Sequence, residues 1–130
     1  MWTYAISPVA TQSGDELLRH KTTWRENYEA ALARAVRDFK CDEVLFVNER
    51  GALTEGSRTN IFLQKNGRLL TPPLSEGVLA GCLRQEMVAE GRCQEAMIFP
   101  DDLVSADVLF LGNSLRGLIA AVPALQARAE

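Results

Sequence analysis

The sequence has few of the residues from which metal sites and disulfide frameworks are built. Its 130 residues include one histidine, His20, and three cysteines, none of them in a CxxC spacing. A metal site or disulfides are therefore not indicated, and the reduced thiols of a cytoplasmic protein are the simplest interpretation. A catalytic triad would have to use His20, so we do not favour that class of enzyme either.

The sequence also lacks an excess of positive charge and any long apolar run. Its net charge is -3 and its pI is about 5.2, which argues against a nucleic-acid partner. No run approaches the ~18 apolar residues of a membrane span, and no signal peptide or nucleotide-binding, zinc-protease or serine-hydrolase motif is present. We therefore expect no nucleic acid and no membrane among its partners, and instead a small molecule or another protein.

The hydrophobic content of 47% is enough for one compact domain over residues 1–130. Apolar residues recur at three and four between Trp24 and Phe39, which predicts a helix with Tyr28, Ala31, Leu32, Ala35, Val36 and Phe39 on one face. Further helices are expected from about residue 82 to 90 and after Pro100. Short apolar runs predict strands at 3–10, 43–48, 61–64, 69–71, 95–99, 107–111 and 118–125.

The predicted strands and helices do not alternate regularly, and the Asn66-Gly67 pair predicts a hairpin between two strands. An α/β or α+β domain with a mixed, mainly antiparallel sheet and flanking helices fits this order best. The chain opens abruptly in the strand-like stretch Met1–Tyr4, which suggests that it begins within a longer protein.

Two charged residues stand where they could carry chemistry. Most lysines are solvated, but Lys21 lies just before the main helix, where its amine could point into a cleft and form a Schiff base. Glu55 lies in a turn-like stretch, where an exposed carboxylate is the ordinary interpretation and a partner for a pyridine nitrogen is the chemical one. We expect Asn60, farther along this stretch, to have a structural role.

Two turns could bind an anion. Gly81 precedes a predicted helix, whose free N–H groups and dipole attract a phosphate. Residues 112–114 follow a buried strand and offer N–H and side-chain groups in a turn. Glycine before a helix is common, so neither turn is specific alone. Together with an amine and a carboxylate, they supply what a phosphorylated aldehyde cofactor requires.

Several motifs occur in the order found in the fold-type IV pyridoxal-phosphate enzymes, the class IV aminotransferase family. They are His20-Lys21-Thr22-Thr23-Trp24-Arg25, Asp42-Glu43-Val44-Leu45-Phe46, Leu53-Thr54-Glu55-Gly56-Ser57-Arg58-Thr59-Asn60-Ile61-Phe62, Leu70-Thr71-Pro72-Pro73, Leu79-Ala80-Gly81-Cys82-Leu83-Arg84 and the stretch from Ala106 to Ser114. Over residues 15 to 122 the chain resembles this family, which includes branched-chain and D-amino-acid aminotransferases and aminodeoxychorismate lyases. The resemblance implies the larger C-terminal domain of the D-amino-acid aminotransferase-like fold.

The resemblance also implies roles for individual residues. Lys21 would form the Schiff base with pyridoxal 5′-phosphate and carry a proton at the substrate carbon, and Glu55 would pair with the pyridine nitrogen. The cofactor phosphate would be bound by Cys82, Leu83, Asn113 and Ser114. Arg25, four residues after Lys21, resembles the lyase pattern and is a substrate-side candidate.

The sequence around Lys21 is most similar to that of lyase domains fused to aminodeoxychorismate synthase component I. It implies a cytoplasmic, homodimeric 4-amino-4-deoxychorismate lyase that releases pyruvate and forms 4-aminobenzoate for folate synthesis. A branched-chain or D-amino-acid transaminase stays open, as does a non-catalytic docking domain in which Lys21 and Glu55 are ordinary surface groups. The N-terminal domain of this family supplies a phosphate-binding arginine and is absent here, so we expect weak cofactor binding and little turnover from the chain alone.

Overall fold

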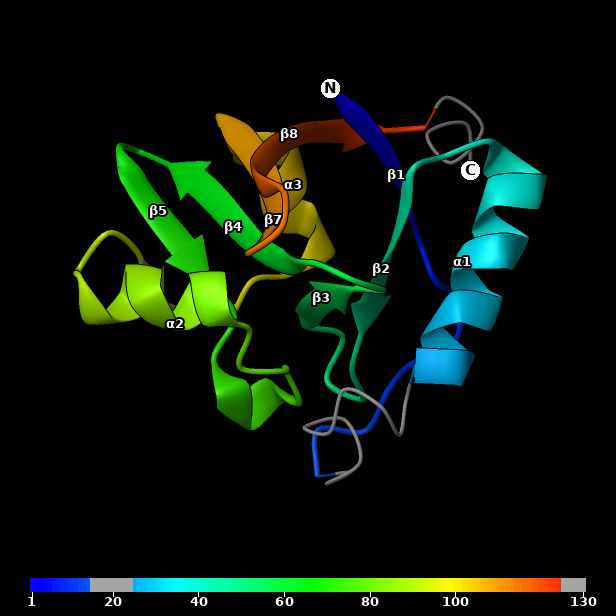
Figure 1. Ribbon diagram of the computed structural model, residues 1–130, viewed down its shortest axis with the longest axis horizontal. Coiled ribbons are helices and arrows are strands. Elements are labelled where there is room, and N and C mark those ends of the chain that lie inside the picture. The colour runs from blue at the N-terminus through cyan, green and yellow to red at the C-terminus, as the bar shows by residue number, and fades with distance from the viewer. Residues whose placement is uncertain (15–24, 125–130) are drawn as a thin grey trace.

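The computed structural model describes residues 1–14 and 25–124, in which eight strands form one sheet (Figure 1). The strands are β1 (Trp2–Ile6), β2 (Glu43–Val47), β3 (Leu53–Gly56), β4 (Asn60–Lys65), β5 (Arg68–Thr71), β6 (Gln94–Glu95), β7 (Val108–Asn113) and β8 (Gly117–Pro123). The helices are α1 (Arg25–Phe39), α2 (Cys82–Ala89) and α3 (Pro100–Ser105), with a 3-10 turn at Leu74–Glu76. Within the described ranges, no helix is long and apolar enough to cross a membrane.

The strand order is β3-β2-β1-β8-β7-β4-β5-β6, and β3 also pairs with β4. The sheet therefore curls until β3 and β4 meet, and β5 and β6 extend outward from β4. Strand β1 runs parallel to β2 and β8, and β6 runs parallel to β5, whereas the remaining pairs are antiparallel. The predicted mixed, mainly antiparallel sheet is confirmed.

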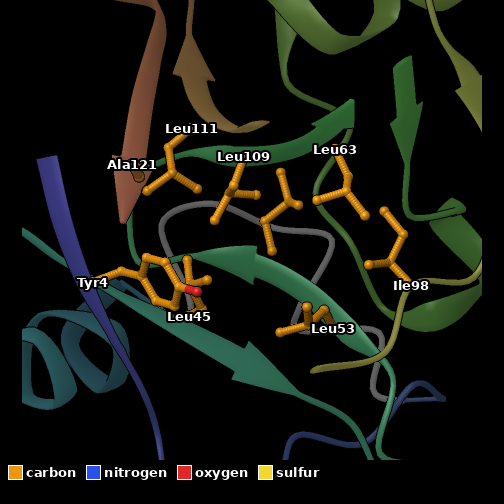
Figure 2. Close-up of a cluster of buried hydrophobic side chains, with 9 residues drawn as sticks. Tyr4, Leu45, Leu53, Leu63, Ile98, Leu109, Leu111 and Ala121 are labelled. Atoms are coloured by element: carbon orange, nitrogen blue, oxygen red, sulfur yellow. The ribbon is translucent and has the colours of Figure 1, made fainter. Parts of the chain in front are cut away.

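The main core lies inside this curl. Figure 2 shows Leu45 and Leu53, from β2 and β3, facing Leu63, Leu109 and Leu111 from β4 and β7. Each of these five side chains is at most 6% exposed. Alternate residues of each strand point into the curl, and α1 and α2 pack on its outer side, whereas Leu103 of α3 packs against the main core.

Helix α1 packs on the outside of β1 and β2 through the face that its spacing predicts. Tyr28, Ala31 and Ala35 are buried there against Phe46 and its neighbours. Val36 was expected on this face but is 44% exposed, because the buried stripe is narrower than the run of apolar residues. Helix α2 covers a different part of the sheet, against β4, β5, β7 and β8 (Figure 1).

Two local expectations have different outcomes. Asn66 and Gly67 have φ values of 53° and 76°, the left-handed pair that a tight hairpin turn needs, so the hairpin is confirmed. The strand expected at 95–99 was wrong beyond its first residue, because only Gln94–Glu95 pairs with β5. Ile98 instead buries its side chain in the main core and accepts a hydrogen bond from the N–H of Leu53 at 2.6 Å.

Candidate active site

Glu55 is a buried strand residue, and the turn expected for it was wrong. It lies on β3, pairs with Asn60 of β4, and is 4% exposed. The hydroxyl of Tyr28 donates to its Oε2 at 3.0 Å and the N–H of Leu79 donates to its Oε1 at 3.1 Å. Burial raises the pKa of the Glu55 carboxyl to about 7, against the lowering effect of these two donors. No lysine or arginine within the described ranges forms an ion pair with it.

The hairpin that carries Glu55 is fixed by a second buried carboxylate, Glu43, which sequence reasoning missed. Its Oε1 accepts from the N–H and hydroxyl of Ser57, and its Oε2 accepts from the N–H of Arg58 at 3.3 Å and the hydroxyl of Thr59 at 3.0 Å. Glu43 is fully buried at the start of β2. The only signal in the sequence was an acidic residue at the start of an otherwise apolar strand. Apart from the adjacent N–H of Val44, the donors to Glu43 lie 14 to 16 residues away.

Asn60 connects this hairpin to the loop before α2. Its Nδ2 donates to the carbonyl of Leu79 at 3.1 Å, while the N–H of Leu79 bonds Glu55. A methyl group on Gly81 would lie 2.5 Å from Asn60 Oδ1, so the loop backbone approaches Asn60 as closely as only glycine allows. Both backbone groups of Leu79 are thus held by side chains of β3 and β4.

The loop delivers the start of α2 to the ends of β4 and β7. Gly81 is the N-cap residue and provides no side-chain cap, so the first N–H groups of this helix are left for another acceptor. Cys82 is exposed there and Leu83 is half-buried. A methyl group on Gly112 of β7 would lie 3.2 Å from Leu83 Cδ2, which places the start of α2 directly against β7.

The β7–β8 turn lies beside the β3–β4 hairpin. The Nδ2 of Asn113 donates to the carbonyl of Arg58 at 2.9 Å, and its Oδ1 accepts from the N–H of Arg116 at 2.9 Å. Ser114 is exposed at the tip of the turn. Gly112 pairs with Asn60 in the sheet, so this turn and the start of α2 lie at the same end of β4 and β7.

The segment that leads toward Lys21 is held at Ser13. Its N–H and hydroxyl donate to the two carboxylate oxygens of Glu49 at 2.8 and 2.6 Å, and these bonds lower the pKa of Glu49 to about 2. Lys21 itself lies outside the described residues. Arg25 is the first residue of α1, and its side chain also lies outside what the structure describes.

The structure therefore brings four of the predicted site residues to one end of strands β4 and β7, near Glu55. They are Cys82, Leu83, Asn113 and Ser114. Sequence reasoning missed Tyr28, which was expected only as part of the core face of α1 and donates to Glu55 through its polar end. It also missed Arg84, which is 1% exposed and reinforces the base of α2 by donating to the carbonyl of Pro72 at 3.0 Å and to Glu95.

Comparison with known proteins assigns this chain to a family. The family model for amino-transferase class IV matches residues 3–122. The chain belongs to the class IV aminotransferase family. A crystal structure from Mesorhizobium loti, named for an amino-acid aminotransferase, has 46% sequence identity and a TM-score of 0.86 over 94% of this chain and 59% of that one.

Family members similar to this chain carry the names of different reactions. A Schizosaccharomyces pombe protein named as an aminodeoxychorismate lyase is 28% identical over 123 residues, covering 92% of this chain and 53% of that protein. A Thermotoga maritima protein named as a branched-chain-amino-acid aminotransferase is 31% identical over 84 residues, covering 61% of this chain and 31% of that protein. The chain thus spans about half or less of these relatives.

Proposed function

We propose that residues 1–130 form the cofactor-binding domain of a pyridoxal-phosphate-dependent 4-amino-4-deoxychorismate lyase, acting in the cytoplasm on a small-molecule substrate. The observation that carries this proposal is Glu55. It is a carboxylate that the fold buries without an ion pair to any lysine or arginine of the described ranges, fixes with two donors, and places close to a helix start that has no side-chain cap. Burying a carboxylate without a cation is costly unless a positive partner arrives, and a protonated pyridine ring is such a partner.

The residues present fit this cofactor. The first N–H groups of α2, at Cys82 and Leu83, and the turn at Asn113 and Ser114 supply donors for a phosphate at one sheet edge. Glu55 lies on the neighbouring hairpin and faces α1 through Tyr28. When bound, the cofactor supplies the electron sink for cleavage next to the amine. The chain supplies anion binding and a fixed carboxylate.

Two other residues complete the proposed site by their place in the sequence. Lys21 would bind the cofactor covalently and move a proton at the substrate carbon, and Arg25 would contact the substrate at the start of α1. Tyr28, three residues later on the same helix, already contacts Glu55. This spacing supports placing the beginning of α1 at the site.

The choice of lyase over transaminase is supported by the share of this chain that aligns with two of its relatives. The relative named for the lyase aligns with 92% of this chain, whereas the one named for the branched-chain aminotransferase aligns with 61%. The identity of 46% with the Mesorhizobium loti structure supports an amino-acid transaminase as the second candidate. Release of pyruvate without an added keto acid identifies the lyase, whereas dependence on a keto acid identifies the transaminase.

The remaining parts of the proposal concern the whole protein. The chain matches 59% of the Mesorhizobium loti chain, and we include a further, N-terminal domain in the proposed complete site. We place a homodimer and an association with aminodeoxychorismate synthase component I in this proposal as well. A chain of residues 1–130 should then bind the cofactor weakly and turn over slowly compared with a chain that includes the N-terminal domain.

The deciding experiment is a visible absorbance scan with added pyridoxal phosphate, before and after borohydride, on the wild type, Lys21→Ala and Lys65→Ala. Lys65 contacts Asp102 and serves as the matched control. A new band that borohydride fixes covalently in the wild type and in Lys65→Ala, but not in Lys21→Ala, supports the proposal. Equal labelling of all three proteins, tested also with the N-terminal domain present, would overturn it.

A further inference from the structure

Two exposed arginines contact one tryptophan, Trp2, at the start of β1. The guanidinium carbon of Arg58 lies 5.2 Å from the centre of the Trp2 ring, and that of Arg116 lies 5.3 Å from the same centre. Arg58 also donates to the carbonyl of Asp42 at 3.0 Å. Within the described ranges neither guanidinium forms an ion pair with a carboxylate. Two positive charges are thus gathered in a chain whose net charge is -3.

The positions of the two arginines are fixed through their backbone groups. Asn113 bonds the carbonyl of Arg58 through its Nδ2 and the N–H of Arg116 through its Oδ1, each at 2.9 Å. One amide side chain therefore ties together the two turns that carry the arginines. A cation over an exposed aromatic ring gains roughly 0.5–1 kcal/mol, and the repulsion between two such cations opposes that gain. An anion that both guanidinium groups bind would offset the repulsion.

We propose that Arg58 and Arg116 bind a carboxylate of the small-molecule substrate. This inference rests on the proposed function, whose substrate carries two carboxylates, and it adds the group that recognises one of them. Guanidinium groups match carboxylates in shape and keep their charge at all physiological pH values. The β7–β8 turn would then serve two ligands. Asn113 and Ser114 face the cofactor phosphate, and Arg116, two residues later, binds the substrate.

The binding can be measured on the chain without cofactor through the emission of Trp2. The sequence has two tryptophans, so Trp24→Phe leaves Trp2 as the only reporter. Fumarate, a dicarboxylate without an amine, is the probe, and neutral fumaramide is its control. We expect fumarate to change the emission saturably and fumaramide to have no effect. Arg58→Gln and Arg116→Gln should each weaken fumarate binding by about tenfold, the usual size for a lost charged hydrogen bond.

Arg37→Gln is the matched control variant, because Arg37 is exposed and pairs with Asp38 on α1. It should bind fumarate as the wild type does. All three exposed arginine variants should keep the wild-type melting temperature, so a change in binding cannot come from unfolding. Absence of a saturable response, or equal binding by Arg58→Gln, Arg116→Gln and Arg37→Gln, would overturn the inference.

The same proteins separate this inference from the proposed function. The cofactor band on Lys21 reports the function, and the fumarate response reports the arginines, so either result can be obtained without the other. Arginine-dependent fumarate binding, with no lysine-linked band even when the N-terminal domain is present, would leave the carboxylate site standing and remove the lyase. Inorganic phosphate is a further arm. If phosphate binds more tightly than fumarate at these arginines, the site is a phosphate site and the assignment to a substrate carboxylate fails.

Discussion

The hydroxyl of Tyr28 donates a 3.0 Å hydrogen bond to Oε2 of Glu55 and so ties helix α1 to strand β3 at the candidate site. The Tyr28 ring also stacks on Phe46, with 4.1 Å between ring centres, which fixes where its hydroxyl points. The carboxylate therefore cannot turn freely. This contact lowers the pKa of Glu55 but does not offset the stronger effect of burial.

Glu55 should make the stability of the cofactor-free chain depend on pH. Its pKa rises from 4.5 to about 7 on folding, so the folded chain holds this proton more tightly and loses stability as pH rises between those values. Glu55→Gln should remove this slope and stabilise the chain at pH 8 by up to ~3 kcal/mol. Urea unfolding at pH 4 and pH 8 measures both. A variant less stable than wild type at pH 8 would contradict the predicted cause.

Tyr28→Phe removes the donor but keeps the stacked ring. At pH 8, where Glu55 is ionised, we expect a loss of about 1.5–3 kcal/mol, the usual contribution of a buried hydrogen bond to a charged group. In the Glu55→Gln background the loss should be smaller, since the partner is then neutral. A double-mutant cycle in urea detects this difference, and equal losses in both backgrounds would show that the hydroxyl acts elsewhere.

Glu43→Ala should be among the most destabilising single changes in the chain. It leaves the N–H groups of Ser57 and Arg58 and the hydroxyl of Thr59 without their acceptor in a partly buried turn. We expect a loss of roughly 3 kcal/mol or more, because unpaired buried donors cost about 1–3 kcal/mol each and relaxation recovers part of it. Glu86→Ala, an exposed change on α2, should cost less than 1 kcal/mol in the same thermal unfolding assay.

Gly112→Ala should separate α2 from β7. The added methyl would lie 2.9 Å from the carbonyl of Gly117 and 3.2 Å from Leu83, so backbone has to move. A cost of about 1–3 kcal/mol is usual for such overpacking, and we expect weaker cofactor binding as well. Gly14→Ala is the matched control, since nothing lies within 4 Å of the added atom. Calorimetric melting and a pyridoxal phosphate titration test both effects, and the same results for both variants would refute the steric argument.

The elements that the sequence predicts well are those defined by short-range patterns. The spacing of Tyr28, Ala31 and Ala35 predicts α1, and Asn66-Gly67 predicts the hairpin, because both signals lie within one element. The buried state of Glu55 could not be predicted, since it depends on Tyr28 and Leu79, 27 and 24 residues away. The exposure of Val36 shows a related limit, because periodicity gives the direction of a helix face but not its width.

The sequence predicted which turns form the candidate site but not how they are held together. The motifs singled out the residues around Gly81 and Gly112, and the structure shows that a side chain at either glycine would meet a close contact. They gave no indication of the side chains that hold these turns in place. Asn113 bonds a residue 55 positions earlier, and Glu43 bonds residues 14 to 16 positions later. Such partners are brought together only by the folded sheet, so the sequence alone does not reveal them.

Strand β1 has a consequence for how this chain folds. It lies between β2 and β8, so β1 is synthesised before both of its neighbours, one starting at residue 43 and the other at residue 117. Both pairings are parallel and long-range, which makes them slow to form. Until β8 is synthesised, β1 keeps an unpaired edge that other chains can occupy. We expect nascent chains that end before Gly117 to depend on chaperones, and release of β8 from the ribosome to be the step that ends this dependence.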